Sequence, residues 1–259
     1  MFRMLQRHTV VLLCVAVVAL FACTGHFLYT GKGWLLVTGK ERVADFYFNR
    51  GLYYFGGGAY NLRTAQSSFE QALAHAGGRY PFAHYQLSRV YFIQSDFASA
   101  LFEADAELAT YPDHFRTHYI KGLTYGYRKQ YIQAAEEFKL FIAGEPTPTW
   151  AGYNDLAWIY FAEGDYQAAS DITKKGMVRW PGSPWLQNSY AVAQLNLGNY
   201  AAAQTYLESA QKLFEAMTPA QWGAAYSGND PSVYASGLEQ TRATIAQNLI
   251  LVHSKLGSI

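Results

Sequence analysis

The most suggestive chemical group in the sequence lies near residue 114. His114 and His118 lie one helical turn apart, a spacing that can place two imidazole nitrogens on one metal ion. No third ligand of clear identity accompanies them, and the nearby Asp105 and Glu107 are expected to face different ways. We therefore favour two histidines at the start of a helix and expect no metal site.

Motifs for catalysis are absent from the sequence. It contains no Gly-x-Ser-x-Gly nucleophile elbow, and no phosphate-binding or dinucleotide-binding fingerprint. The glycines at 56–58 fall where a turn between two helices is expected. Both cysteines, Cys14 and Cys23, lie in an apolar N-terminal stretch, so the rest of the chain has no cysteine ligand. The expectation is a protein that is not an enzyme and needs no cofactor.

The elements that must position any binding side chains belong to a repeated unit, which is clearest at residues 153–181. Residues 153–162 and 166–179 carry apolar side chains at helical spacing, and Gly164 interrupts the pattern between them. Pro181 ends the unit because proline cannot continue a helix. The unit is therefore predicted to be two short helices joined by a tight turn.

Copies of this unit follow one another along the chain. The aromatic residue that opens the second helix recurs at intervals of 37, 34, 35 and 34 residues, at Tyr60, Phe97, Tyr131, Tyr166 and Tyr200. A small residue recurs in each helix, as is needed where two antiparallel helices cross closely: Gly51, Ser88, Gly122, Ala157 and Ala191 in the first, and Ala65, Ala100, Ala134, Ala169 and Ala203 in the second. First helices are predicted near 43–56, 81–94, 115–128, 149–162 and 183–197, and second helices near 60–76, 97–110, 131–143, 166–179 and 200–216.

A helix–turn–helix unit of about 34 residues with these small, aromatic and proline positions resembles the tetratricopeptide repeat (TPR). The resemblance covers roughly residues 44–215. It implies an all-α, right-handed solenoid of about five helix pairs, with repeats at 43–80, 81–114, 115–148, 149–182 and 183–217. It also implies an interaction scaffold that binds a protein or peptide, and it implies no reaction.

Residues 218–259 depart from the repeat pattern and are predicted to cap the solenoid. Thr218-Pro219 and Asp230-Pro231 each read as a helix N-cap followed by proline at the first helical position. A loop is predicted between them, at 223–229. The helix that starts at Pro231 is expected to run to about Lys255 and to bury one apolar stripe, Leu238, Ile245, Leu249 and Val252.

The TPR resemblance also implies which residues face the concave side, because first helices line that side in the family. The candidate binding residues on this face are aromatic, amide and arginine side chains: Phe48, Tyr85, Arg89, Phe92, Arg116, Tyr119, Asn154, Trp158, Phe161, Trp185 and Asn188. Asn154 and Asn188 can hydrogen-bond the backbone of an extended peptide, and Arg89 and Arg116 can hold a carboxylate. Packing between repeats does not require Phe48, Phe92, Trp158 and Phe161, yet these residues are expected to face inward. Exposed aromatic clusters of this kind mark binding sites.

Two other uses of the concave face stay open. The N-terminal connector or the terminal helix can fill it, or it can pack against a membrane or a second copy of the chain. The acidic and basic residues of the second helices, Glu136, Glu137, Lys139, Lys174 and Lys175, are expected to form a solvated face.

Residues 1–29 contain an uncharged run of 20 residues, from Thr9 to Leu28, which is long enough to span a bilayer as a helix. We expect a single-pass signal anchor, a juxtamembrane connector at 30–42, and repeats on the extracytoplasmic side. A cleaved signal peptide leading to secretion, a lipoprotein signal ending at Cys23, and a soluble core helix stay open.

The net charge of +1 predicts no nucleic-acid partner. The sequence therefore favours a membrane-tethered scaffold for a protein or peptide partner. The alternative is a structural or assembly subunit that acts through repeat packing or self-association. A third hypothesis, a carrier for a small ligand such as a glycan, rests on the inward aromatic residues alone.

Overall fold

The computed structural model describes residues 26–29, 34–37, 39–146, 149–225 and 229–257. The signal anchor predicted at 1–29 and its alternatives lie outside the described residues, apart from the last few positions. Those positions form strand β1 (His26–Tyr29), which pairs antiparallel with β2 (Trp34–Val37). The predicted apolar run therefore does not continue as a helix to Tyr29, because the backbone of 26–29 pairs with a neighbouring strand. Within the described part of the chain, no helix has the length and apolar character that a bilayer crossing requires.

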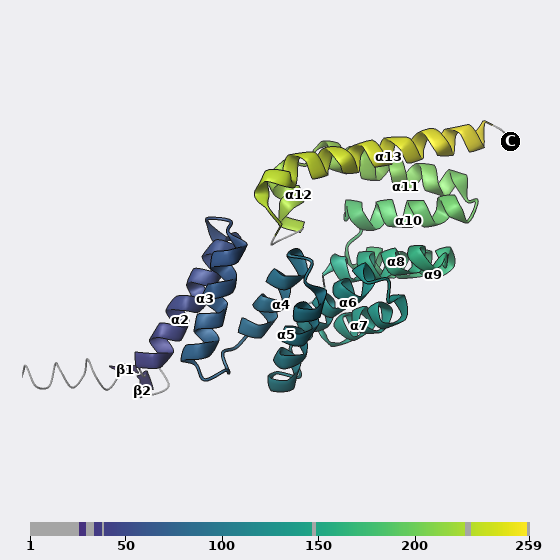
Figure 1. Ribbon diagram of the computed structural model, residues 1–259. Helices are drawn as coiled ribbons and strands as arrows, with labels where there is room; N and C mark the ends of the chain where they lie inside the picture. The colour runs from purple at the N-terminus through teal and green to yellow at the C-terminus, as the bar shows by residue number, and fades with distance from the viewer. Residues whose placement is uncertain (1–25, 30–33, 38, 147–148, 226–228, 258–259) are drawn as a thin grey trace, which may run out of the picture.

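Consecutive helix pairs make up most of the chain and stack into a curved solenoid (Figure 1). The pairs are α2 (Gly39–Leu52) with α3 (Leu62–His75), α4 (Ala83–Ile93) with α5 (Phe97–Thr110), α6 (Arg116–Tyr127) with α7 (Tyr131–Gly144), α8 (Trp150–Glu163) with α9 (Tyr166–Arg179), and α10 (Pro184–Asn196) with α11 (Tyr200–Glu215). These bounds confirm the predicted helices to within a few residues. The first pair differs most, because α2 begins at Gly39 and continues into a π-helical turn, η1 (Tyr53–Gly57).

The predicted small residues lie where the two helices of each pair cross, and all of them are buried. Gly51 packs against the ring of Phe69, and Gly122 packs against the ring of Phe138. Ser88 donates its hydroxyl to the carbonyl of Ala100 at 2.8 Å, so a polar side chain fits here without an unpaired group. Close crossing thus depends on side-chain size, as the repeat pattern predicts.

The turn inside each of the last four pairs uses one residue with left-handed backbone geometry. Glycine supplies it at Gly164 and Gly198, with φ of 75° and 80°, but Ser95 and Lys129 supply it in the second and third pairs, with φ of 62° and 59°. Two of these turns are closed by an aspartate that caps the next helix: Asp96 accepts from the Ser99 amide and Asp165 accepts from the Ala168 amide.

The C-terminal region contains α12 (Pro219–Ala225), a short 3₁₀ turn η2 (Pro231–Val233) and the long helix α13 (Tyr234–Leu256). The predicted apolar stripe of α13 is buried against α11. Arg242 of α13 donates hydrogen bonds to the carbonyls of Phe214, Glu215 and Met217 at 2.9 to 3.0 Å. Phe214 and Glu215 end α11 and Met217 follows it, so Arg242 caps the C-terminus of the last repeat.

Candidate functional site

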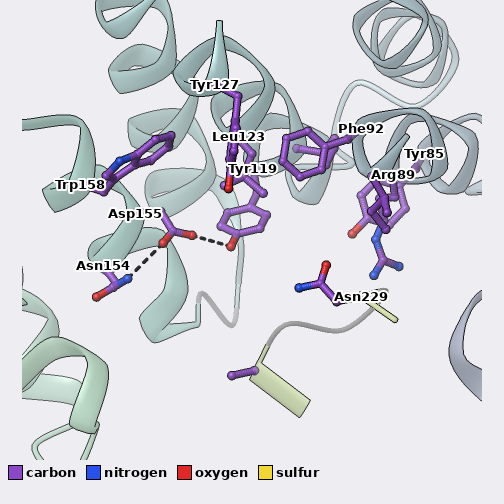
Figure 2. Close-up of a pocket in the computed structure, with 13 residues that line it drawn as sticks. Tyr85, Arg89, Phe92, Tyr119, Leu123, Tyr127, Asn154, Asp155, Trp158 and Asn229 are labelled. Atoms are coloured by element: carbon purple, nitrogen blue, oxygen red, sulfur yellow. Dashed lines mark hydrogen bonds between the residues drawn. The ribbon is translucent and has the colours of Figure 1, made fainter. Parts of the chain in front are cut away.

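The inner helices α4, α6 and α8 line a cavity of about 480 Å³. Five of its thirteen lining residues are aromatic, and the C-terminal region contributes Ala225 and Asn229. Figure 2 shows Trp158, Asp155 and Asn154 at one end of this cavity and Tyr85 and Arg89 at the other. We call it the central cavity below.

An aromatic row runs along the central cavity from one repeat to the next. Phe92 of α4 meets Tyr127 of α6 edge to face, with ring centroids 5.3 Å apart, and Tyr127 lies 5.4 Å from Trp158 of α8. Gly126 makes room for this contact, since a Cβ atom there would lie 2.6 Å from the Trp158 ring. Three successive inner helices therefore contribute one ring each to a continuous aromatic surface.

A polar network closes the Trp158 end of the cavity. The Tyr119 hydroxyl donates to the carboxylate of Asp155 at 2.6 Å, and the Asn154 side-chain amide donates to it at 3.1 Å. The Ser189 hydroxyl of the next inner helix donates to the side-chain oxygen of Asn154 at 2.8 Å. Burial raises the pKa of Asp155, because desolvation disfavours its charged form more than the two hydrogen bonds favour it.

Arg89 forms the other end of the cavity by stacking between aromatic rings. Its guanidinium carbon lies 4.5 Å from the ring centroid of Phe55 and 5.6 Å from that of Tyr85. It also donates to the Gln86 side chain at 2.9 Å. These contacts link the first helix pair to the second and fix the position of the charge.

A second cavity of about 510 Å³ adjoins the first, and Tyr85 lines both. Its wall includes Phe48, Phe82 and Arg116. Arg116 forms an ion pair with Glu145 at 3.6 Å. Phe82 has a left-handed backbone (φ 66°), which is unusual for a bulky residue, and its ring lies 4.6 Å from that of His114.

The structure brings together eight of the eleven predicted site residues. Six line the central cavity: Tyr85, Arg89, Phe92, Tyr119, Asn154 and Trp158. Phe48 and Arg116 line the second cavity. The expectation that packing does not need Phe48 is wrong, because its ring packs on those of Phe69 and Tyr80.

The other three predicted site residues line neither cavity. Phe161 packs near Tyr166, and Trp185 stacks on Trp150 with ring centroids 4.4 Å apart. The carbonyl oxygen of the Asn188 side chain is buried and finds no hydrogen-bond partner among the residues that the structure describes. The two asparagines therefore differ: the Asn154 amide joins a network, and Asn188 does not.

Seven residues of the central cavity were not predicted as site residues. Three of them carry a polar group: Tyr127, Asp155 and Asn229. Tyr127 and Asp155 do carry a signal, since both lie on inner helices beside predicted residues. No local pattern points to Asn229, which reaches the cavity only through the path of the C-terminal region.

In Figure 1, α12 lies on the concave side of the solenoid, between the α2–α3 pair and α10. Burial, followed by the charges of Asp230 and Tyr234, raises the pKa of Tyr60. The C-terminal region forms part of the wall of the central cavity through Ala225 and Asn229. The alternative in which the chain fills its own concave face stays a prediction.

The two histidines that suggested a metal site have separate carboxylate partners. His114 bonds Glu107 at 3.0 Å and His118 bonds Glu137 at 2.6 Å. The described residues contain no group of three or more histidine, cysteine or acidic side chains suited to a metal ion. The prediction that Glu137 belongs to a solvated face is wrong, since His118 and Lys121 cover it between adjacent helices.

No protein-family model matches the chain, and no curated protein matches it in sequence. Solved structures match it in fold. MamA from Desulfovibrio magneticus RS-1, residues 41 to the end, superposes with a TM-score of 0.58 and 18% identity, over 67% of this chain and 96% of that one. PilW, described as a type IV pilus biogenesis factor, superposes with a TM-score of 0.61 and 16% identity, over 84% of this chain and 93% of PilW. PilF of Pseudomonas aeruginosa superposes with a TM-score of 0.59 and 16% identity, over 85% of this chain and 92% of PilF.

These similar structures are TPR-like all-helical proteins, and at this identity they establish the fold alone. The chain is therefore a TPR-like all-α solenoid. Its right-handed sense and the exact number of TPR units stay predictions.

Proposed function

We propose that this protein is a non-catalytic scaffold that binds an extended peptide segment of a partner protein in its concave groove. The observation that carries the proposal is the pair of adjoining cavities of about 480 and 510 Å³, which share Tyr85 and run along successive inner helices. Aromatic side chains supply large contact areas at low entropic cost, and convergent polar groups set orientation. An elongated ligand with side chains suits such a surface better than a compact one.

The scaffold is proposed to be tethered to a membrane, with its repeats on the extracytoplasmic side. Support comes from the uncharged run in residues 1–29, which lies outside the described part of the chain. PilW, a solved protein of similar fold, is described as a pilus biogenesis factor, which is compatible with an assembly role at the cell surface. Cell fractionation with protease protection tests this: repeats that stay resistant to external protease in spheroplasts would contradict it.

The groove is tested by the double substitution Asn154→Ala with Trp158→Ala. Both residues line the central cavity, so the variant should lose partners that the unaltered chain captures from solubilised membranes. A matched control replaces two exposed residues of the outer helices, Phe102→Ala with Val178→Ala. Circular dichroism should show equal helical content in all three proteins. Recovery of the same partners by the groove variant would refute the proposal.

A second candidate function is a structural subunit that self-associates through its outer helices. It is favoured by large apolar side chains at high exposure on second helices of successive pairs: Phe102 at 71%, Ile132 at 74% and Val178 at 81%. Cross-linking that joins α5, α7 or α9 of two copies would support this function. A chain that stays monomeric at all accessible concentrations would exclude it.

A further inference from the structure

The carboxylate of Asp155, at one end of the central cavity, can accept more hydrogen bonds than it receives. An ionised carboxylate offers about four lone-pair positions, and Tyr119 and Asn154 occupy two of them here. No ion pair joins Asp155 to any residue in the described part of the chain. Its surroundings make the charge costly, since burial raises the pKa of this carboxyl. A cation that entered the cavity would offset that cost.

The walls beside Asp155 favour the same kind of ligand. Trp158 and Tyr127 meet with ring centroids 5.4 Å apart, and Phe92 continues the row. Aromatic faces carry negative potential and attract ammonium and guanidinium groups, with tryptophan and tyrosine the most effective. Tyr127 is 60% exposed, so its ring is open to a ligand. A long apolar stem can lie along such rings while its charged head reaches the carboxylate.

The opposite end of the cavity does not supply this cation. The guanidinium of Arg89 stacks on Phe55 and Tyr85 and bonds Gln86. Figure 2 shows Arg89 and Asp155 at opposite ends of the cavity, and the charge of Arg89 is not among the causes of the shifted Asp155 pKa. The two charges therefore define separate parts of the groove.

We propose that Asp155, Trp158, Tyr127 and Phe92 form a subsite for the cationic side chain of a lysine or arginine in the bound peptide. This inference rests on the proposed function, since it names the side chain that the peptide groove selects. An acidic side chain would meet repulsion from Asp155. A purely apolar one would leave the carboxylate without an opposite charge.

The test begins with selection of random peptides displayed on phage against the immobilised full chain. We expect lysine or arginine to be enriched at one position. An enriched peptide is then synthesised in two forms, one with arginine and one with citrulline, which has nearly the same shape without the charge. Calorimetry should give at least about a tenfold weaker affinity for the citrulline peptide, as expected for loss of a charged hydrogen bond in a desolvated site.

Substitutions test whether the preference for the arginine peptide arises at Asp155. Asp155→Asn keeps an acceptor for the Tyr119 hydroxyl and should bind the two peptides equally, with the arginine peptide weakened by about tenfold or more. The control Asp171→Asn removes an exposed carboxylate on the outer helix α9 and should keep the preference for arginine.

Each outcome separates the two proposals. Enriched peptides without a basic residue, or equal affinities of the two peptides for the unaltered chain, overturn the cationic subsite and leave the scaffold standing. That second measurement needs no variant, so it decides the matter even if Asp155→Asn fails to fold. A selection that enriches no peptide overturns both proposals.

Discussion

Gly122 of α6 lies directly against the ring of Phe138 of α7, so that a Cβ atom on Gly122 would fall 2.9 Å from the ring. Gly51 and Phe69 form the same pair in the first repeat. In the second repeat the small residue is Ser88, and Ala104 stands in place of the phenylalanine. A glycine thus faces a phenylalanine in the first and third repeats, whereas the second repeat has serine and alanine at these two positions, so the two side chains together fill the crossing.

Gly122→Ala should therefore destabilise the protein although alanine is the better helix former. Overpacking against Phe138 typically costs about 1–3 kcal/mol, and the gain in helix propensity returns about 1 kcal/mol, so we expect a net loss of about 1 kcal/mol. Urea denaturation monitored by circular dichroism measures it. Gly182→Ala, at an exposed site with nothing within 4 Å of the new Cβ, is the control. Adding Phe138→Leu should recover part of the loss, and equal stability of both glycine variants would contradict the explanation.

Lys129→Gly should stabilise the protein. Lys129 has a φ of 59° in the turn before α7, where the corresponding residues of later repeats are glycines. A left-handed backbone costs non-glycine residues about 1–2 kcal/mol, and the greater chain entropy of glycine offsets part of that gain. We expect a net increase of about 0.5 kcal/mol in the free energy of unfolding. The reverse change, Gly164→Ala, should destabilise. If both changes have the same sign, backbone strain does not govern these turns.

The His84–Glu103 pair predicts a loss of stability at alkaline pH. The hydrogen bond to Glu103 at 2.6 Å raises the pKa of His84 above its ordinary value. A raised histidine pKa means that the folded state binds the proton more tightly, so its contribution is fully present below about pH 6.5. The contribution disappears as pH rises through the raised pKa. Unfolding in urea between pH 6 and 9 should follow this trend, and Glu103→Gln should flatten it. An unchanged slope in Glu103→Gln would assign the trend to other groups.

Asp155→Asn should stabilise the empty protein at neutral pH. Burial raises the pKa of Asp155, so its charged form opposes folding as pH rises through that pKa. Asparagine can still accept from the Tyr119 hydroxyl without a buried charge. The melting temperature of the variant should therefore exceed that of the unaltered chain at pH 7, and the difference should shrink as pH falls. A variant that melts lower at pH 7 would show that the carboxylate contributes to stability.

The repeated unit could be predicted from sequence because its determinants are short in range. The helix bounds follow from apolar spacing and from breakers such as Gly164 and Pro181, and the close crossings follow from residues such as Ala157 and Ala169. The inward positions of Tyr85, Arg89, Phe92 and Trp158 follow from the phase of the first helices, once the TPR resemblance sets which side is concave. A local pattern repeated in several copies is therefore sufficient for these features.

Only the tertiary structure decided how far the solenoid curves and what meets across it. The contact of Tyr119 with Asp155 depends on the rotation between neighbouring repeats, and so do the burial of Glu137 and the position of Asn229. This rotation sums small shifts at every interface between helix pairs, each set by the volumes of many side chains together. No short pattern in the sequence encodes that sum. The repeat unit is thus a property of the sequence, whereas the shape of the groove and the place of Ala225 and Asn229 in its wall are properties of the packed whole.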